Sequence, residues 1–252
     1  MKKLIPLLLF FVALPSWGRQ FDVEVIVFKR TVNPEQTAES WPNTLPEINL
    51  ENAGSFSDAN YRSQKGVRIL PYSSYRLKGS AEKLKKHAGF EVLMHTAWRQ
   101  GDRGRLSAPI FHIQSGKDFS SKFNQDGTLK GSVQGTEVIE GVTEETIPTA
   151  LYELDGKIQV YVDHYLYADV QMDLKQPSVR ESVLQVPLKF EGKAAEGDAV
   201  QSGFMEQVAP TIQKQEFLKS YRFDQKRRMK SSETHYFDHP LMGMIIQVRR
   251  AW

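Results

Sequence analysis

Residues 157–174 read KIQVYVDHYLYADVQMDL, and apolar and polar side chains alternate along the whole stretch. Successive side chains of a β-strand point to opposite faces of the sheet, so the pattern predicts one very long strand with a buried and a solvent-facing side. The Asp155-Gly156 pair directly before it is typical of a two-residue hairpin turn. We therefore expect a long β-hairpin around residues 149–174. Its solvent-facing side would carry Gln159, Tyr161, Asp163, Tyr165, Tyr167, Asp169, Gln171 and Asp173.

Further strands are predicted on both sides of this hairpin. Residues 20–28 (QFDVEVIVF) are apolar on both faces near their end, which indicates a strand in the middle of its sheet. Strand-like composition recurs in residues 90–99, 107–113, 182–191, 217–223, 234–237 and 241–248. The basic residues that follow position 223 are interpreted as a connection between two of these strands.

One helix is predicted near residues 75–88. Leu77, Ala81, Leu84 and Ala88 recur at helical spacing and form one apolar stripe. Gly89 follows at the position where a left-handed C-terminal cap is favoured. One helix among many strands predicts an α+β fold, mainly antiparallel β-sheet with few helices. We expect residues 19–252 to form a single domain of this kind.

Residues 30–71 interrupt the regular pattern. They contain prolines at positions 34, 42, 46 and 71 and few periodic apolar residues, which predicts a long irregular segment. A connection of this length inside a compact domain is usually functional or mobile. Four apolar side chains are expected to attach it to the body of the domain: Trp41, Leu45, Ile48 and Leu50.

The N-terminus has the three parts of a secretory signal peptide in residues 1–18. Lys2 and Lys3 precede an apolar run, and Ser16 and Gly18 are small residues before the expected cleavage site. An uncleaved anchor is the alternative, although the run is short for a membrane span. The chain has no cysteine, so neither a disulfide nor a lipoprotein acceptor is available. We expect a periplasmic protein without a transmembrane anchor after cleavage.

Net charge gives little indication of a partner. The formal charge of the whole chain is +3, and it falls to about +1 without the two lysines of the leader. This balance and an exported location do not favour a nucleic-acid ligand. Ser80 and Lys83 match a Ser-x-x-Lys pattern, but the partner motifs of penicillin-binding enzymes do not occur, so no catalytic residue is predicted.

The segment from His235 to Pro240 (HYFDHP) is the densest candidate metal site. On a strand, His235 and His239 would share a face while Asp238 points away, which leaves two ligands where zinc needs at least three from the protein. We interpret the histidines as structural and Asp238 as the cap of a turn. The alternative is a metal-dependent cell-wall hydrolase that uses His235, Asp238 and His239.

Two further groups suggest a binding surface. Arg222, Lys226, Arg227, Arg228 and Lys230 form a basic stretch that can clamp the carboxylates of peptide stems or muramic lactyl groups, or else form a solvated hairpin. The tyrosine face and Trp98-Arg99 can stack on sugar rings, or else pack within the sheet. We predict no metal or cofactor. The candidate ligand-binding residues are Trp98, Arg99, Tyr165, Tyr167, Arg227, Arg228, His235, Tyr236, Asp238 and His239.

Several stretches resemble one known family. They are FDVEVIVFKR (21–30), AWRQ (97–100), the API and HIQ runs within 108–114, LDGKIQVYVDHYLY (154–167) and RRMKSSETHYFDHPLMGMIIQV (227–248). Together they resemble the CsiV family of periplasmic peptidoglycan-binding proteins of gammaproteobacteria, and the closing YFDHP motif is the most specific. The resemblance implies peptidoglycan binding and support of a bifunctional penicillin-binding synthase through its outer-membrane lipoprotein activator. It assigns no binding residues. A protein-only envelope assembly factor is a further alternative.

Overall fold

The computed structural model describes residues 18–37, 39–131, 150–184 and 211–251, without the side chains of residues 182–184 and 211–213. Its first sheet, sheet A, has the order β3 (Arg68–Ile69), β4 (Phe90–Gly101), β1 (Gln20–Arg30), β10 (Met242–Ala251) and β9 (Thr234–Asp238). All neighbouring strands in it are antiparallel. The prediction that residues 20–28 form a central strand is confirmed, because β1 has a partner on each side.

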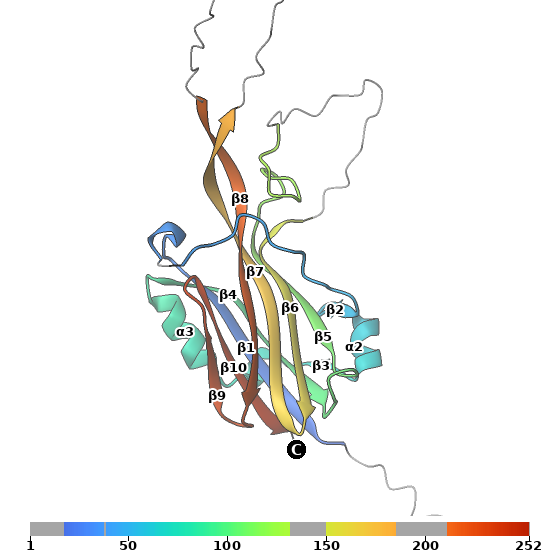
Figure 1. Cartoon of the computed structure of the whole chain (residues 1–252). Helices are drawn as coiled ribbons and strands as arrows, with labels where there is room; N and C mark the ends of the chain where they lie inside the picture. The colour runs from blue at the N-terminus through green and yellow to red at the C-terminus, as the bar shows by residue number, and fades with distance from the viewer. Residues whose placement is uncertain (1–17, 38, 132–149, 185–210, 252) are drawn as a thin grey trace, which may run out of the picture.

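The second sheet, sheet B, has the order β2 (Ala53–Ser55), β5 (Ile110–Asp118), β6 (Tyr152–Asp163), β7 (Tyr165–Leu184) and β8 (Thr211–Met229). Only the short β2 runs parallel to its neighbour β5. Strands β7 and β8 continue as a two-stranded ribbon beyond the body of the molecule (Figure 1). The expectation of a mainly antiparallel α+β fold with few helices is confirmed.

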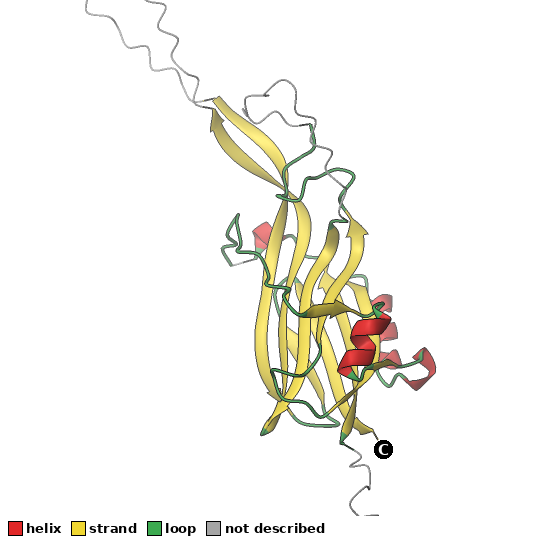
Figure 2. Ribbon diagram, turned by 90° about the vertical axis from the view of Figure 1, so that its right-hand side faces the viewer, coloured by secondary structure: helices red, strands yellow, loops and turns green. Residues whose placement is uncertain are grey.

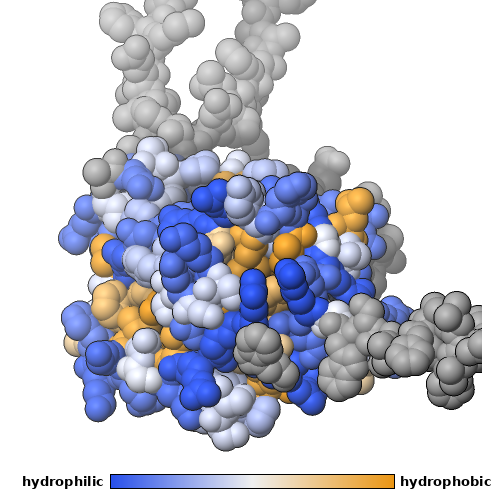
Figure 3. Space-filling view, turned by 90° about the horizontal axis from the view of Figure 1, so that it is seen from below, coloured by the Kyte–Doolittle hydropathy of each residue, from blue (hydrophilic) through white to orange (hydrophobic). Residues whose placement is uncertain are grey.

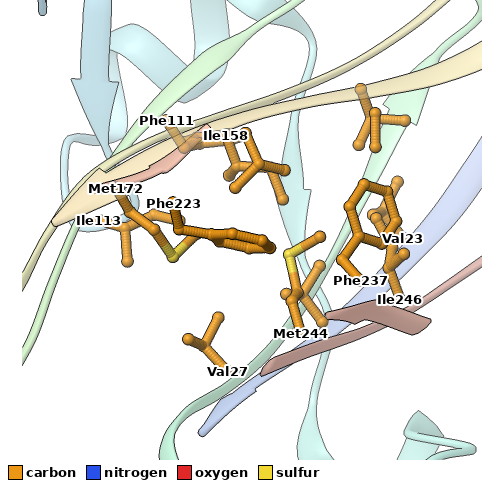
Figure 4. Close-up of a cluster of buried hydrophobic side chains, with 14 of the residues drawn as sticks. Val23, Val27, Phe111, Ile113, Ile158, Met172, Phe223, Phe237, Met244 and Ile246 are labelled. Carbon is orange, nitrogen blue, oxygen red and sulfur yellow. The ribbon is translucent and has the colours of Figure 1, made fainter. Parts of the chain in front are cut away.

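The two sheets pack face to face, and the main core lies between them (Figure 2). Figure 4 shows side chains of sheet A, among them Val27 and Met244, pointing toward Met172 and Phe223 of sheet B. These side chains are at most 1% exposed, so the apolar half of each alternating strand becomes the inner face of a sandwich. Because the core draws on both sheets, neither sheet can bury its inner face without the other.

The predicted hairpin turn at Asp155-Gly156 is wrong. Both residues lie inside β6, and the chain reverses at His164, whose φ is +58° and whose neighbours Asp163 and Tyr165 face each other across the turn. A side chain at Gly156 would lie 2.3 Å from Met172 Cα, so this glycine permits close approach of two strands. The alternation continues through the turn because each residue of β6 pairs with one of the same parity in β7.

Helix α3 (Lys78–Lys86) confirms the predicted helix but begins three residues later than expected, after a short 3-10 turn, η2 (Tyr72–Ser74). Its Leu77–Ala81 stripe packs on Ile26 of the outer face of sheet A. Gly89 is not a left-handed cap, because the helix ends at His87 in an extended conformation. The prediction of a left-handed cap at Gly89 is therefore wrong, whereas the apolar stripe was identified correctly.

The segment between β1 and β4 is more regular than predicted. It contains η1 (Pro34–Gln36), β2, α2 (Ala59–Lys65) and β3 in addition to η2. Its irregular part, residues 41–50, is called the strap here; it crosses the outer face of sheet B (Figure 1). Arg222 holds it through the Pro46 carbonyl at 2.7 Å, and Lys157 through the Asn49 carbonyl at 2.6 Å. The four apolar residues expected to attach the segment are half-buried: Trp41, Leu45, Ile48 and Leu50.

Side chains join the two sheets where β8 lies beside β9. Gln225 Nε2 donates to the Asp238 carbonyl at 2.8 Å, and an Arg227 N–H donates to the Tyr236 carbonyl at 2.7 Å. These bonds satisfy backbone acceptors of an edge strand that otherwise has a partner only on its β10 side. In the described part of the chain, no helix is long and apolar enough to cross a bilayer.

Candidate functional site

Five side chains gather on the outer face of sheet B beside the β6–β7 turn. Tyr167 pairs with Tyr161 on β6 and with Arg228 on β8, while Tyr165 and Lys226 lie next to them on the same face. Pairing across three strands thus brings together residues that are distant in sequence. We call this group the tyrosine–cation surface: Tyr161, Tyr165, Tyr167, Lys226 and Arg228. Tyr161 was expected to face solvent but is buried, at 2% exposed, whereas the other four are exposed or half-buried.

The cations of this surface lie on the tyrosine rings. The rings of Tyr161 and Tyr167 are stacked with centroids 5.5 Å apart, and Lys226 Nζ lies 5.6 Å and 5.4 Å from them. The Arg228 guanidinium lies 4.3 Å from the centroid of Tyr165, which is 54% exposed. Such contacts are worth roughly 0.5–1 kcal/mol at exposed sites and restrict where a flexible cation can go.

Four strand arginines form ion pairs with acids, whereas Arg228 does not: Arg30, Arg99, Arg222 and Arg249. Arg99 binds both carboxylate oxygens of Asp22 at 2.6 and 2.9 Å, and Arg222 likewise binds Asp173. By contrast, within the described ranges neither the Lys226 nor the Arg228 side chain forms an ion pair or a hydrogen bond. Their N–H donors are therefore available to an anionic ligand.

A polar cleft of about 550 Å³ adjoins the tyrosine–cation surface on the same face. Gln159, Asp169 and Asp224 contribute to its lining, and each lies two residues from a member of the surface along its strand. Arg105 contacts Asp169 at 3.4 Å, and Gln171 donates to Asp224 at 2.9 Å. A second cleft of about 400 Å³ lies beneath the strap. The outer face of sheet B is thus both concave and charged.

Hydrophilic side chains cover most of the surface at this end of the molecule. Seen from the end that carries the β6–β7 turn, the surface is mostly hydrophilic, and apolar side chains form separate patches (Figure 3). A ligand bound here would therefore be recognised mainly through ionic and hydrogen-bonding groups.

Comparison with protein families identifies the chain. A family model described as "Peptidoglycan-binding protein, CsiV" matches residues 3–251, a range that includes every strand of both sheets. The chain belongs to the CsiV family. No curated protein and no solved structure gives a match.

The structure separates the candidate residues of this CsiV chain into several places. Tyr165, Tyr167 and Arg228 lie together in the tyrosine–cation surface. Arg227 points to the opposite face of β8, where its guanidinium lies 4.9 Å from the Phe237 ring centroid. Trp98 is 1% exposed in the core, so its ring is not presented to solvent, and Arg99 lies on the outer face of sheet A.

The HYFDHP motif does not converge on one point. His235 Nε2 lies 3.1 Å from the Lys230 N–H, while Tyr236 and Asp238 contact each other and Arg30 on the outer face of sheet A. His239 is buried against Trp41 and Phe223. Burial lowers the pKa of the His239 imidazole, and the Arg30 charge lowers it further while Asp238 opposes this.

The expected separation of the motif's side chains is confirmed, because His235 and Asp238 lie on opposite faces of β9. Elsewhere on the described chain, too, no three potential metal-ligating side chains cluster. Sequence analysis missed two neighbours of the candidate residues. Arg30 joins Tyr236 and Asp238 only through the β1–β10–β9 pairing, and Asp224 joins the face of the tyrosine–cation surface only because β8 continues through the basic stretch.

Proposed function

We propose that this CsiV chain is a noncatalytic periplasmic protein that binds peptidoglycan through the tyrosine–cation surface. Family membership over nearly the whole chain carries the proposal. The unpaired Lys226 and Arg228 support the location of the site, since the carboxylates of peptidoglycan are suitable ligands for them. The leader pattern in residues 1–18 supports export with cleavage after Gly18. The core shared by both sheets supports a single domain over residues 19–252.

The proposal extends to a role as an adaptor in wall synthesis. In this role the chain would hold peptidoglycan while contacting the outer-membrane lipoprotein activator of a bifunctional penicillin-binding synthase. The support is the resemblance of residues 21–248 to the CsiV family. A capture experiment with the purified activator tests this part: saturable binding is expected, and its absence at micromolar concentration would remove the adaptor role.

A metal-dependent hydrolase is less well supported. His235, Asp238 and His239 are each held by different neighbours, and two of the three point to opposite faces of β9. Metal analysis of the purified chain separates the alternatives. Stoichiometric zinc that disappears when His235 and His239 are both changed to Ala would favour the hydrolase.

Binding itself is tested by sedimentation of residues 19–252 with purified sacculi. The wild-type chain is expected in the pellet, and the combined Lys226→Gln and Arg228→Gln variant mostly in the supernatant. The matched control is Arg180→Gln, which removes a cation 5.2 Å from the Phe217 ring in the same strand pair. Arg180 pairs with Gln215 and Arg228 with Tyr167, so the two positions lie roughly 40 Å apart along the ribbon.

Each result of this experiment has a defined meaning. A wild-type chain that stays in the supernatant contradicts peptidoglycan binding. Retention of the wild type and of both variants alike leaves binding intact and rejects the tyrosine–cation surface as its site. A chain that binds the activator but never sacculi would be a protein-only assembly factor.

A further inference from the structure

Three charged side chains form a row along the outer face of β8. Asp224, Lys226 and Arg228 are alternate residues of one strand, so their Cα atoms are spaced about 6.6 Å apart. The two cations have no acidic partner within the part of the chain that the structure describes. Asp224 accepts a hydrogen bond from the Gln171 side chain at 2.9 Å but has no cationic partner among those same residues. The row therefore presents one negative and two positive groups in a fixed order.

The cations in the row are held without being neutralised. Lys226 lies over two rings and Arg228 over one, and ring faces leave the outward N–H donors of a cation unused. A ligand carboxylate could accept hydrogen bonds from these N–H donors while the cations stay on the rings. A neutral sugar that stacks on the same ring faces would first have to move the cations away. The geometry therefore favours an ionised ligand over an uncharged glycan.

We propose that the row recognises the ionised groups of a peptidoglycan stem peptide: its carboxylates at Lys226 and Arg228, and the free ammonium of its diamino acid at Asp224. This inference rests on the proposed peptidoglycan-binding function and specifies the part of the polymer that is bound. Cross-linking forms an amide between the terminal carboxyl of one stem and the ammonium of another, so each joined stem loses one of these ionised groups. The row therefore distinguishes stems that are still free from stems that are joined. The chain thereby binds preferentially where the wall is incompletely cross-linked.

Calorimetric titration of residues 19–252 with four probes tests this. They are a stem tetrapeptide containing a diamino acid, the same peptide with its side-chain amine acetylated, the same peptide with its carboxylates amidated, and the neutral sugar chitotetraose. Amidation is expected to weaken binding about tenfold or more, because charge-assisted bonds to Arg are lost. Acetylation is expected to weaken it roughly two- to fivefold, the range of an exposed ion pair. Chitotetraose is expected not to compete.

The Asp224→Asn variant makes the test specific. The acetylated and free peptides are expected to bind this variant equally, because the variant lacks the carboxylate that would distinguish them. Arg180→Gln is the control and should keep the wild-type preference. Thermal unfolding checks that each variant is folded: Asp224 is exposed and Arg180 half-buried, so neither change removes a core side chain.

Several results would overturn the inference while leaving the proposed function standing. They are equal affinity for the amidated peptide, an acetylation cost that persists in Asp224→Asn, competition by chitotetraose, or sacculus binding without any binding of the stem peptide. Failure of the wild-type chain to bind sacculi at all would instead remove the proposed function, so the two failures are distinguishable.

Discussion

The Glu24 carboxylate accepts a hydrogen bond from the Leu77 N–H at 2.8 Å, so a side chain from the centre of sheet A caps helix α3. The same carboxylate contacts His95 at 3.0 Å and Arg249 at 2.9 Å, and the residue is 0% exposed. Helix α3 has no capping side chain of its own. The helix and three strands are therefore fixed to one another through a single buried acid.

Glu24→Gln is expected to lower the free energy of unfolding at pH 7 by roughly 2–3 kcal/mol. Burial raises the pKa of Glu24, but hydrogen bonds from His95, Arg249 and two backbone N–H groups outweigh it and lower the pKa from 4.5 to about 2. A lowered folded-state pKa adds stability above pH 4.5 that is lost as pH falls toward 2. Urea unfolding between pH 7 and pH 3 should show this loss in the wild type and a smaller one in the variant. Glu82→Gln, on the exposed side of α3, is the control; an equal effect there would contradict the assignment.

Tyr161→Phe is expected to be neutral or to stabilise the fold by up to about 1 kcal/mol. Its hydroxyl is buried and has no hydrogen-bond partner among the described residues, so removing it relieves an unpaired polar group. The contrasting variant is Tyr61→Phe, whose hydroxyl donates to the Ile110 carbonyl at 2.7 Å and accepts from the Ile110 N–H at 2.8 Å. That change should cost about 1–2 kcal/mol in chemical unfolding. Effects of the same sign and size would refute this reasoning.

His239→Asn is expected to flatten the decline of stability as pH falls below neutral. Burial lowers the pKa of His239 in the folded chain, so the unfolded chain takes up this proton first as pH falls through about 6.5, and folding then becomes less favourable. Thermal unfolding between pH 7.5 and 5 measures the slope. The control is His164→Asn, at an exposed left-handed position that asparagine tolerates. A slope that changes in the control alone would contradict the prediction.

Gly156→Ala and Gly79→Ala are expected to have opposite effects. A Cβ at Gly156 would lie 2.3 Å from Met172 Cα and 2.4 Å from the Gln171 carbonyl oxygen, and neither backbone can move without disturbing the sheet. A loss of roughly 2–4 kcal/mol is expected. At Gly79 in α3 nothing lies within 4 Å, so alanine should stabilise by about 0.5 kcal/mol through its higher helix propensity. The denaturant midpoints of the two variants measure these changes in stability. An unchanged midpoint for Gly156→Ala would contradict the observed packing.

Arg227→Gln and Arg228→Gln are expected to separate stability from binding. Arg227 joins β8 to the Tyr236 carbonyl, so its loss should lower stability by about 1 kcal/mol and leave sacculus binding unchanged. The Arg228 side chain lies on the Tyr165 ring and forms no hydrogen bond or ion pair with the described residues, so its loss should weaken binding and leave unfolding nearly unchanged. The reverse assignment would show that the binding face is on the other side of β8.

Sequence alternation was enough to predict many of the strands, but not their arrangement in two facing sheets. The central place of β1 followed from apolar residues on both of its faces, and the stripe of α3 followed from its spacing. The turn could not be placed, because Asp155-Gly156 has turn-like composition whereas His164 reverses the chain without interrupting the alternation. Only tertiary contacts reveal that Gly156 is needed for close approach of two strands.

The candidate site could be predicted only in part, because the extent of one strand was not recognised. Tyr165 and Tyr167 were assigned to the solvent-facing side from the two-residue alternation of the strand. The basic stretch, by contrast, was interpreted as a connection between two strands. Strand β8 in fact extends through it to Met229, so Arg227 and Arg228 point to opposite faces. Trp98 was ambiguous, because β4 is apolar on both faces, and its inward direction is fixed only by its pairing with Val23.

The pairing of β1 with β10 joins Gln20 to Ala251, and it affects how the chain can fold as well as how it is held. Sheet A lacks an inner strand until β10 has been synthesised, so until then one backbone edge of β1 has no partner strand. Removal of β10 would correspondingly leave β1 without a neighbour on one edge.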